Sequence, residues 1–79
     1  MRELDLHGES REIARILIEE FIRDSIKMGE EQIKIIHGIG TGILRKVTQT
    51  TLQKEKCVLE YKTSYFNRGS TIVWLKVDK

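Results

Sequence analysis

The 79-residue chain lacks proline, has one cysteine and contains no long hydrophobic run. The single cysteine, Cys57, cannot form an internal disulfide, and small secreted domains usually carry several, so the composition favours a reducing cytoplasm. The longest uncharged stretch, residues 35–44, has ten residues and three glycines, well short of the roughly 18 apolar residues of a membrane span. No signal peptide is recognisable. These absences predict a cytoplasmic protein that does not cross a bilayer.

The sequence also lacks any linker-like segment. Without proline or a Ser/Gly-rich stretch, residues 1–79 are predicted to form a single domain. A domain of this size buries only about 60–65% of the surface that its unfolded chain exposes. That limit argues against enzymes that enclose a large cofactor.

Charge is distributed unevenly around a net value of +2. Residues 1–31 hold five Lys/Arg and nine Asp/Glu, whereas residues 32–79 hold nine Lys/Arg and three Asp/Glu. A basic second half is compatible with one anion-binding face, although a solvated helix surface explains the acidic first half equally well.

Hydrophobic periodicity predicts a first strand and a first helix. A short apolar alternation over residues 3–6 ends at a His-Gly pair, which is typical of a strand followed by a turn. A helix is predicted from Ser10, as its N-cap, to about Met28, with Gly29 able to take the left-handed conformation that ends helices. Its predicted inner face consists of Ile13, Ala14, Leu17, Ile18, Phe21 and Ile22.

The middle of the chain predicts a second strand and a second helix. An isoleucine-rich run over residues 32–36 precedes three closely spaced glycines and indicates a buried strand. A helix is predicted from Ile43 to about Lys54, with Thr41 as its cap. Its predicted inner face consists of Leu44, Val47, Thr48, Thr51 and Leu52.

The remaining residues predict a closing hairpin, with strands over 57–63 and 70–77. Cys57, Leu59 and Tyr61 are expected on one side of the first of these strands, and Trp74 is expected to be buried against the helices. The order β-α-β-α-β-β begins with a right-handed parallel unit. The expected fold class is α/β, more specifically an α+β two-layer sandwich of two helices on a mixed four-stranded sheet.

Unusual residues follow both predicted parallel strands. Asp5 and His7 close the first strand and His37 follows the second, so both histidines are expected at the sheet edge where α/β proteins bind ligands. Asp5 and His7 share a strand face and can together orient a proton-transfer group near neutral pH. With His37 they can equally bind a divalent metal such as Mg²⁺ or Mn²⁺. A purely structural alternative is that Asp5 accepts backbone amides and His7 helps form a turn.

A glycine cluster after the second strand is a candidate phosphate site. Because glycines lack side chains, backbone amides can approach a phosphate there, and the following helix presents free N–H groups. A tight turn that needs positive φ is the alternative interpretation. The candidate nucleic-acid-binding residues are Gly38, Gly40, Thr41, Gly42, Arg45, Lys46 and Arg68.

Two common nucleotide-binding motifs do not fit this cluster. The glycine spacing departs from the dinucleotide fingerprint, whose third glycine comes one residue later. The lysine and hydroxyl pair of a Walker loop is also missing, since Gly42 is followed by Ile43 and Leu44. These departures argue against nicotinamide or flavin binding and against an NTPase.

Two segments together resemble the signature motifs of the Smr, or small MutS-related, domain family. They read LDLHG at residues 4–8 and IIHGIGTGILR at residues 35–45, separated by a predicted helix of about twenty residues. The resemblance covers essentially the whole chain. The chain departs from many relatives in the short loop at residues 67–70, where they have a longer glycine-rich loop.

The resemblance implies an endonuclease that nicks DNA or cleaves RNA, including messenger RNA on stalled or collided ribosomes. It also implies a fold similar to the C-terminal domain of a bacterial translation initiation factor. Smr domains occur at the C-terminus of larger MutS-like ATPases and as separate small proteins. Carried over by motif, the resemblance points to Asp5, His7 and His37 as catalytic residues and to Gly38, Gly40 and Arg45 as phosphate contacts.

Three functions follow as hypotheses. The leading one is phosphodiester cleavage, with Asp5 and His7 managing protons and His37 or the loop amides stabilising charge on the phosphate. The second is a binding module without chemistry, which uses basic side chains for phosphates and aromatic ones for stacking. A third is a protein-docking domain whose interface is the acidic first helix. The binding module would use Arg45, Lys46, Lys62, Arg68, Tyr65 and Phe66.

Overall fold

The computed structural model describes residues 1–64 and 69–78, and its elements follow the predicted order. They are β1 (Arg2–Asp5), α1 (Arg11–Lys27), β2 (Gln32–Ile36), α2 (Ile43–Lys54), β3 (Val58–Ser64) and β4 (Ser70–Leu75). The predicted fold class is confirmed: two helices lie on a mixed four-stranded sheet. The predicted turn residues Tyr65, Phe66 and Arg68 lie outside the described residues.

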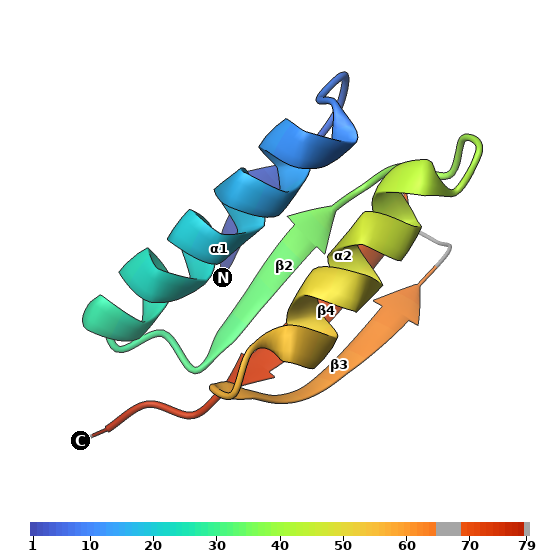
Figure 1. The fold of residues 1–79 in the computed structure, drawn as a ribbon. Helices are drawn as coiled ribbons and strands as arrows, with labels where there is room; N and C mark the ends of the chain where they lie inside the picture. The colour runs from blue at the N-terminus through green and yellow to red at the C-terminus, as the bar shows by residue number, and fades with distance from the viewer. Residues whose placement is uncertain (65–68, 79) are drawn as a thin grey trace.

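The sheet has the strand order β1-β2-β4-β3. β1 is parallel to β2, and β4 is antiparallel to both β2 and β3. Both helices cover the same face of this sheet (Figure 1), and no helix of residues 1–64 and 69–78 lies on its other face. The core therefore forms one layer between helices and sheet, and the strands contribute Ile33, Ile35, Val73 and Leu75 to it.

The first helix begins and ends as predicted. Ser10 is its N-cap, with the hydroxyl oxygen accepting a hydrogen bond from the Ile13 amide at 3.3 Å. The prediction that Ile13 faces the core is wrong, since its side chain is 46% exposed. At 100° per residue, Ile13 lies about 120° around the axis from the centre of the buried stripe. Ser25 occupies that stripe instead, fully buried, and its hydroxyl accepts a hydrogen bond from Arg2.

The second helix buries two threonines with its core leucine. Thr48 and Thr51 are buried beside Leu52, while Leu44 and Val47 pack partly buried against the core. The Thr48 hydroxyl donates to the Leu44 carbonyl at 2.8 Å, so its burial leaves no polar group without a partner. This bond explains how a β-branched polar residue is accommodated inside the helix.

Two predictions for the hairpin are wrong. A bulge between Val58 and Glu60 shifts the alternation of β3, so that Leu59 is 65% exposed. In β4, Val73 and Leu75 face the helices, and strand alternation therefore turns Trp74 to the opposite face, where it is half-buried.

Neither α1 nor α2, the helices of residues 1–64 and 69–78, has the length and apolar character that a membrane-spanning helix requires.

Candidate functional site

The parallel strands β1 and β2 end at the same sheet edge. Asp5 lies opposite Ile36 in the strand register, and the Leu6 amide donates to the Ile36 carbonyl at 2.9 Å. His7 and His37 follow immediately after this last pairing. Both histidines therefore lie at the edge to which the glycine cluster also belongs.

His7 sits in a tight turn that Asp5 stabilises. The turn closes through a hydrogen bond from the Glu9 amide to the Leu6 carbonyl at 3.0 Å. Gly8 has φ of +78°, which a type II turn requires at its third position. The Asp5 carboxylate accepts a hydrogen bond from the His7 backbone amide at 2.9 Å. Asp5 thus holds the turn, and the exposed imidazole of His7 is presented to solvent.

His37, in contrast, is built into the protein interior. Its side chain is 6% exposed, and Nδ1 lies 3.0 Å from the Gly38 carbonyl oxygen, which can only accept, so Nδ1 carries a proton. Nε2 lies 2.9 Å from the Thr71 hydroxyl, which lies 3.0 Å from the Thr63 hydroxyl. The Gln49 amide donates to Thr63 at 3.4 Å. With a neutral imidazole, each hydroxyl donates onward, and a continuous chain of hydrogen bonds links α2, β3 and β4 to the glycine loop.

The environment of His37 favours this neutral form. Burial lowers the pKa of the imidazole below its ordinary value of 6.5, the hydrogen bond to Gly38 opposes that change, and the charge of Arg45 lowers the pKa further. A neutral ring can accept the Thr71 hydroxyl hydrogen at Nε2 while donating to Gly38 at Nδ1. The pKa and the hydrogen-bond pattern therefore agree.

Stability is expected to fall as the pH is lowered below 6.5. The unfolded chain protonates His37 at a higher pH than the folded protein does, so it binds more protons in this window, and protons favour unfolding. The slope contributed by one such group is at most about 1.4 kcal/mol per pH unit. Urea denaturation between pH 7 and pH 5 measures it, with His37→Gln as the control whose amide does not titrate. Equal slopes in both proteins would contradict the assignment.

The glycine loop is tied to the end of the β3–β4 hairpin. The amides of His37 and Gly38 both donate to the Gly69 carbonyl oxygen at 3.0 Å. Gly38 has φ of +81° and Gly69 has φ of +67°, a region that glycine enters without strain. A Cβ atom on Gly69 would lie 2.5 Å from the Gly38 carbonyl oxygen. Only glycine allows the two backbones to approach this closely.

The start of α2 completes the loop. Gly42, with φ of +83°, is the N-cap, and Thr41 precedes it, so the prediction of Thr41 as the cap is wrong. Because Gly42 has no side chain, the Thr41 hydroxyl accepts the Ile43 amide instead, at 3.4 Å. The Arg45 guanidinium lies against Gly42, where a Cβ atom would meet its Nη2 at 2.9 Å. A small cavity of about 150 Å³ lies beneath this loop, lined by His37 among others.

The predicted catalytic residues Asp5 and His37 lie on opposite faces of the sheet, whereas most of the predicted nucleic-acid-binding residues lie together. Strand alternation places Asp5 on the sheet face away from the helices, whereas His37 faces the core side with Thr71. Among the described residues, no three His, Cys, Asp or Glu side chains form a metal-binding group, so Asp5, His7 and His37 do not fit a shared metal ion. Gly38, Gly40, Thr41, Gly42, Arg45 and Lys46 lie together in one loop and the first turn of α2.

Sequence reasoning missed the polar chain behind His37. Thr63 and Thr71 alternate with core residues of their strands, so each points inward. Two inward threonines on neighbouring strands require a polar partner inside the protein. That pattern was the available signal for the burial of His37.

The order and geometry of these motifs agree with one family. A family model described as Smr domain matches residues 4–76. The chain belongs to the Smr domain family. Similar proteins include Endonuclease MutS2 of Geobacillus sp. (strain WCH70), which is 42% identical over 69 residues, or 87% of this chain and 9% of that protein. Endonuclease MutS2 of Alkaliphilus metalliredigens (strain QYMF) is 36% identical over 77 residues, or 94% of this chain and 10% of that protein. The Smr chain spans about a tenth of these relatives.

Two solved structures share the Smr fold. The crystal structure of the Smr domain of Thermus thermophilus MutS2 matches with a TM-score of 0.89 at 26% identity, covering 95% of this chain and 98% of that one. YdaL, a stand-alone small MutS-related protein from Escherichia coli, matches with a TM-score of 0.86 at 25% identity, covering 94% of this chain and 63% of that one. Smr domains of this architecture therefore occur both within MutS2 and in a stand-alone protein.

Proposed function

We propose that residues 1–79 act as one nucleic-acid-binding endonuclease domain. The observation that carries the proposal is the juxtaposition, at one sheet edge, of an exposed imidazole with a glycine loop flanked by cations. His7 supplies the imidazole, and Arg45 and Lys46 supply the cations. The relationship to proteins named Endonuclease MutS2 supports the same reaction class.

The proposed chemistry assigns a separate role to each predicted catalytic residue. His7 is the proton-transfer group, because its ring is exposed to an incoming substrate. With RNA it accepts the 2′-hydroxyl proton as that oxygen attacks phosphorus; the bond from phosphorus to the 5′-oxygen breaks, and a 2′,3′-cyclic phosphate and a 5′-hydroxyl result. With DNA it accepts a proton from the attacking water, and one P–O ester bond breaks. In both reactions the leaving oxygen takes a proton from solvent. Asp5 positions His7 through the backbone amide, and His37 positions the loop through the Gly38 carbonyl. Loop amides and Arg45 stabilise the charge that develops on the phosphate.

The test is a cleavage assay with labelled single-stranded RNA, single-stranded DNA and supercoiled plasmid. Each substrate is incubated with the protein in Mg²⁺, in Mn²⁺ and in a chelator. An identically purified Asp5→Ala/His7→Ala double variant controls for contaminating nuclease. We expect that at least one substrate is cleaved. The cleavage activity should elute with the folded protein in gel filtration and should be lost in the double variant. Cleavage that is equal in both proteins, or absent from both, would overturn the proposal.

A second candidate function is a binding module without chemistry. It is favoured by the fact that Asp5 and His37 are both engaged within the chain, Asp5 by a backbone amide and His37 at both ring nitrogens. This function predicts binding that weakens steeply with salt and no cleavage by wild-type protein. Lys46→Ala would then weaken binding to every sequence, while His7→Ala would leave binding unchanged.

A further inference from the structure

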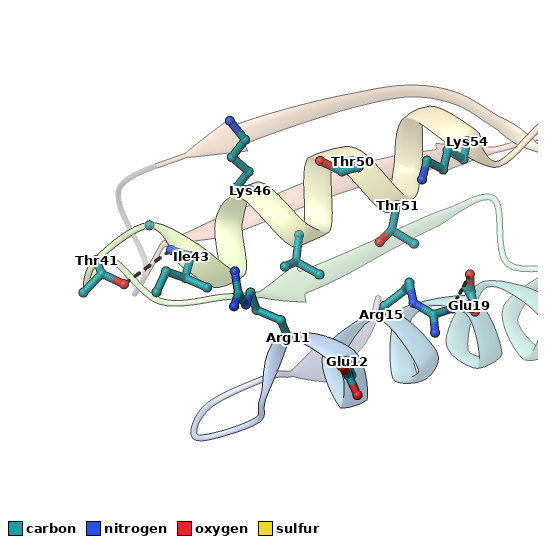
Figure 2. Close-up of a pocket in the computed structure, with 12 residues that line it drawn as sticks. Arg11, Glu12, Arg15, Glu19, Thr41, Ile43, Lys46, Thr50, Thr51 and Lys54 are labelled. Atoms are coloured by element: carbon teal, nitrogen blue, oxygen red, sulfur yellow. Dashed lines mark hydrogen bonds and ion pairs between the residues drawn. The ribbon is translucent and has the colours of Figure 1, made fainter.

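A groove runs between the two helices on the side of the molecule away from the sheet. It has a volume of about 820 Å³ and extends from the loop before α2 to the last residue of that helix (Figure 2). Four cationic side chains line it, two from each helix, together with two carboxylates. The cations are Arg11, Arg15, Lys46 and Lys54, and the carboxylates are Glu12 and Glu19.

The cationic side chains of the groove outnumber its carboxylates. Glu19 pairs with Arg15 at 3.1 Å, which leaves Glu12 as the other carboxylate of the lining. Figure 2 shows the Glu12 carboxylate directed away from α2 and the Lys46 ammonium directed away from α1. Within residues 1–64 and 69–78, neither Arg11 nor Lys54 forms an ion pair. Moreover, no acidic residue occurs between positions 32 and 54, so the α2 wall carries positive charge only. A polyanion is the ligand that complements this lining.

The groove is continuous with the candidate site. Thr41, Gly42 and Ile43 line both the groove and the small cavity beneath the glycine loop. A strand whose phosphate lies on the loop amides therefore reaches the groove without crossing another element. Ile43, 49% exposed, also gives the groove an apolar wall against which sugars or bases can pack.

The dimensions favour a single strand. Packed helices have axes about 8–10 Å apart, so the furrow between them accommodates one backbone and excludes a duplex from its floor. Single-strand-binding proteins use a positively charged groove that follows the backbone in this way.

We propose that the α1–α2 groove binds a single nucleic-acid strand and leads it to the glycine loop. This inference rests on the proposed function and adds Arg11 and Lys54 to the phosphate contacts. It makes the first half of α1, from Arg11 to Glu19, a part of the binding surface.

The test compares Arg11→Ala/Lys54→Ala with a matched control, Lys27→Ala/Lys56→Ala. Both variants lose two positive charges, and Lys27, like Lys54, lies in the last turn of a helix, but neither control residue lines the groove. Binding of fluorescent single-stranded oligonucleotides of about 4 and about 12 nucleotides is measured by anisotropy across a salt series.

The groove variant is expected to bind the longer oligonucleotide about 25-fold more weakly at 0.1 M salt, with the slope of log K against log salt reduced by about 1.4. The control variant should bind within about twofold of wild type, because it removes no phosphate contact. The affinities of the two variants for the shorter oligonucleotide should differ less, since that oligonucleotide can bind to the glycine loop without entering the groove.

Three results would overturn the inference. They are equal affinities of the two variants for the longer strand, an equal loss for both oligonucleotide lengths, and an equal loss for a duplex. If wild-type protein still binds and cleaves nucleic acid in these cases, the proposed function is unaffected. Failure of wild-type protein to bind or cleave any nucleic acid would remove the proposed function itself, and the groove inference with it.

Discussion

His7→Ala is expected to lower the cleavage rate by about 10²–10⁴-fold, the usual contribution of a positioned proton-transfer group. His7 is exposed, and the turn that carries it is closed by backbone hydrogen bonds and by the Asp5 carboxylate. Removal of the imidazole therefore leaves the fold and the phosphate contacts in place. Single-turnover cleavage and oligonucleotide anisotropy on the same preparation separate chemistry from binding.

Asp5 offers an internal control for this prediction. Asp5→Ala removes the acceptor of the His7 amide and should reduce cleavage by allowing the turn to move. Asp5→Asn retains a side-chain oxygen that can accept the same hydrogen bond and should restore most of the rate. If His7→Ala cleaves at the wild-type rate, or loses cleavage and binding together, the proton-transfer role of His7 is wrong.

Gly69→Ala is expected to destabilise the protein by about 2–5 kcal/mol. The new Cβ atom would lie 2.5 Å from the Gly38 carbonyl oxygen, and alanine would also have to adopt φ of +67°. One of the two backbones must shift, and this shift breaks the hydrogen bonds that the His37 and Gly38 amides donate to the Gly69 carbonyl oxygen. The loss is measured by urea denaturation, and nucleic-acid binding should weaken because the loop moves.

Gly29→Ala is the matched control for the backbone strain. Gly29 has φ of +76°, but a Cβ atom there would meet nothing within 4 Å. The Gly29→Ala substitution should therefore lower the free energy of unfolding only by the strain of the left-handed conformation, about 1–2 kcal/mol. Equal destabilisation by the two substitutions would show that the close approach of Gly69 to Gly38 contributes nothing to stability.

The fold could be predicted from sequence because its signals are local. The apolar spacing of α1 and the Ser10 cap are properties of neighbouring residues, and the structure bears out the predicted element order. The errors in the hairpin concern pairing between strands. Leu59 turned outward because a bulge in β3 changed its alternation, and such a bulge depends on the partner strand β4.

The candidate site was predictable in position but not in internal arrangement. Both histidines were expected at one sheet edge, since parallel strands end together. Their opposite environments depend on alternation across the whole sheet, which turns His37 toward Thr71 and leaves His7 in an exposed turn. The groove requires the relative placement of two helices, and no local pattern in either helix encodes that placement.

Trp74 gives the protein a built-in spectroscopic reporter. It is the one tryptophan of the chain, and strand alternation places it, half-buried, on the sheet face opposite to the helices that form the groove. Its emission should change on unfolding, when β2, β3 and β4 separate. It should change little when a nucleic-acid strand occupies the groove. Stability and ligand occupancy can therefore be followed in one sample, by tryptophan emission and by the fluorescence of a labelled oligonucleotide.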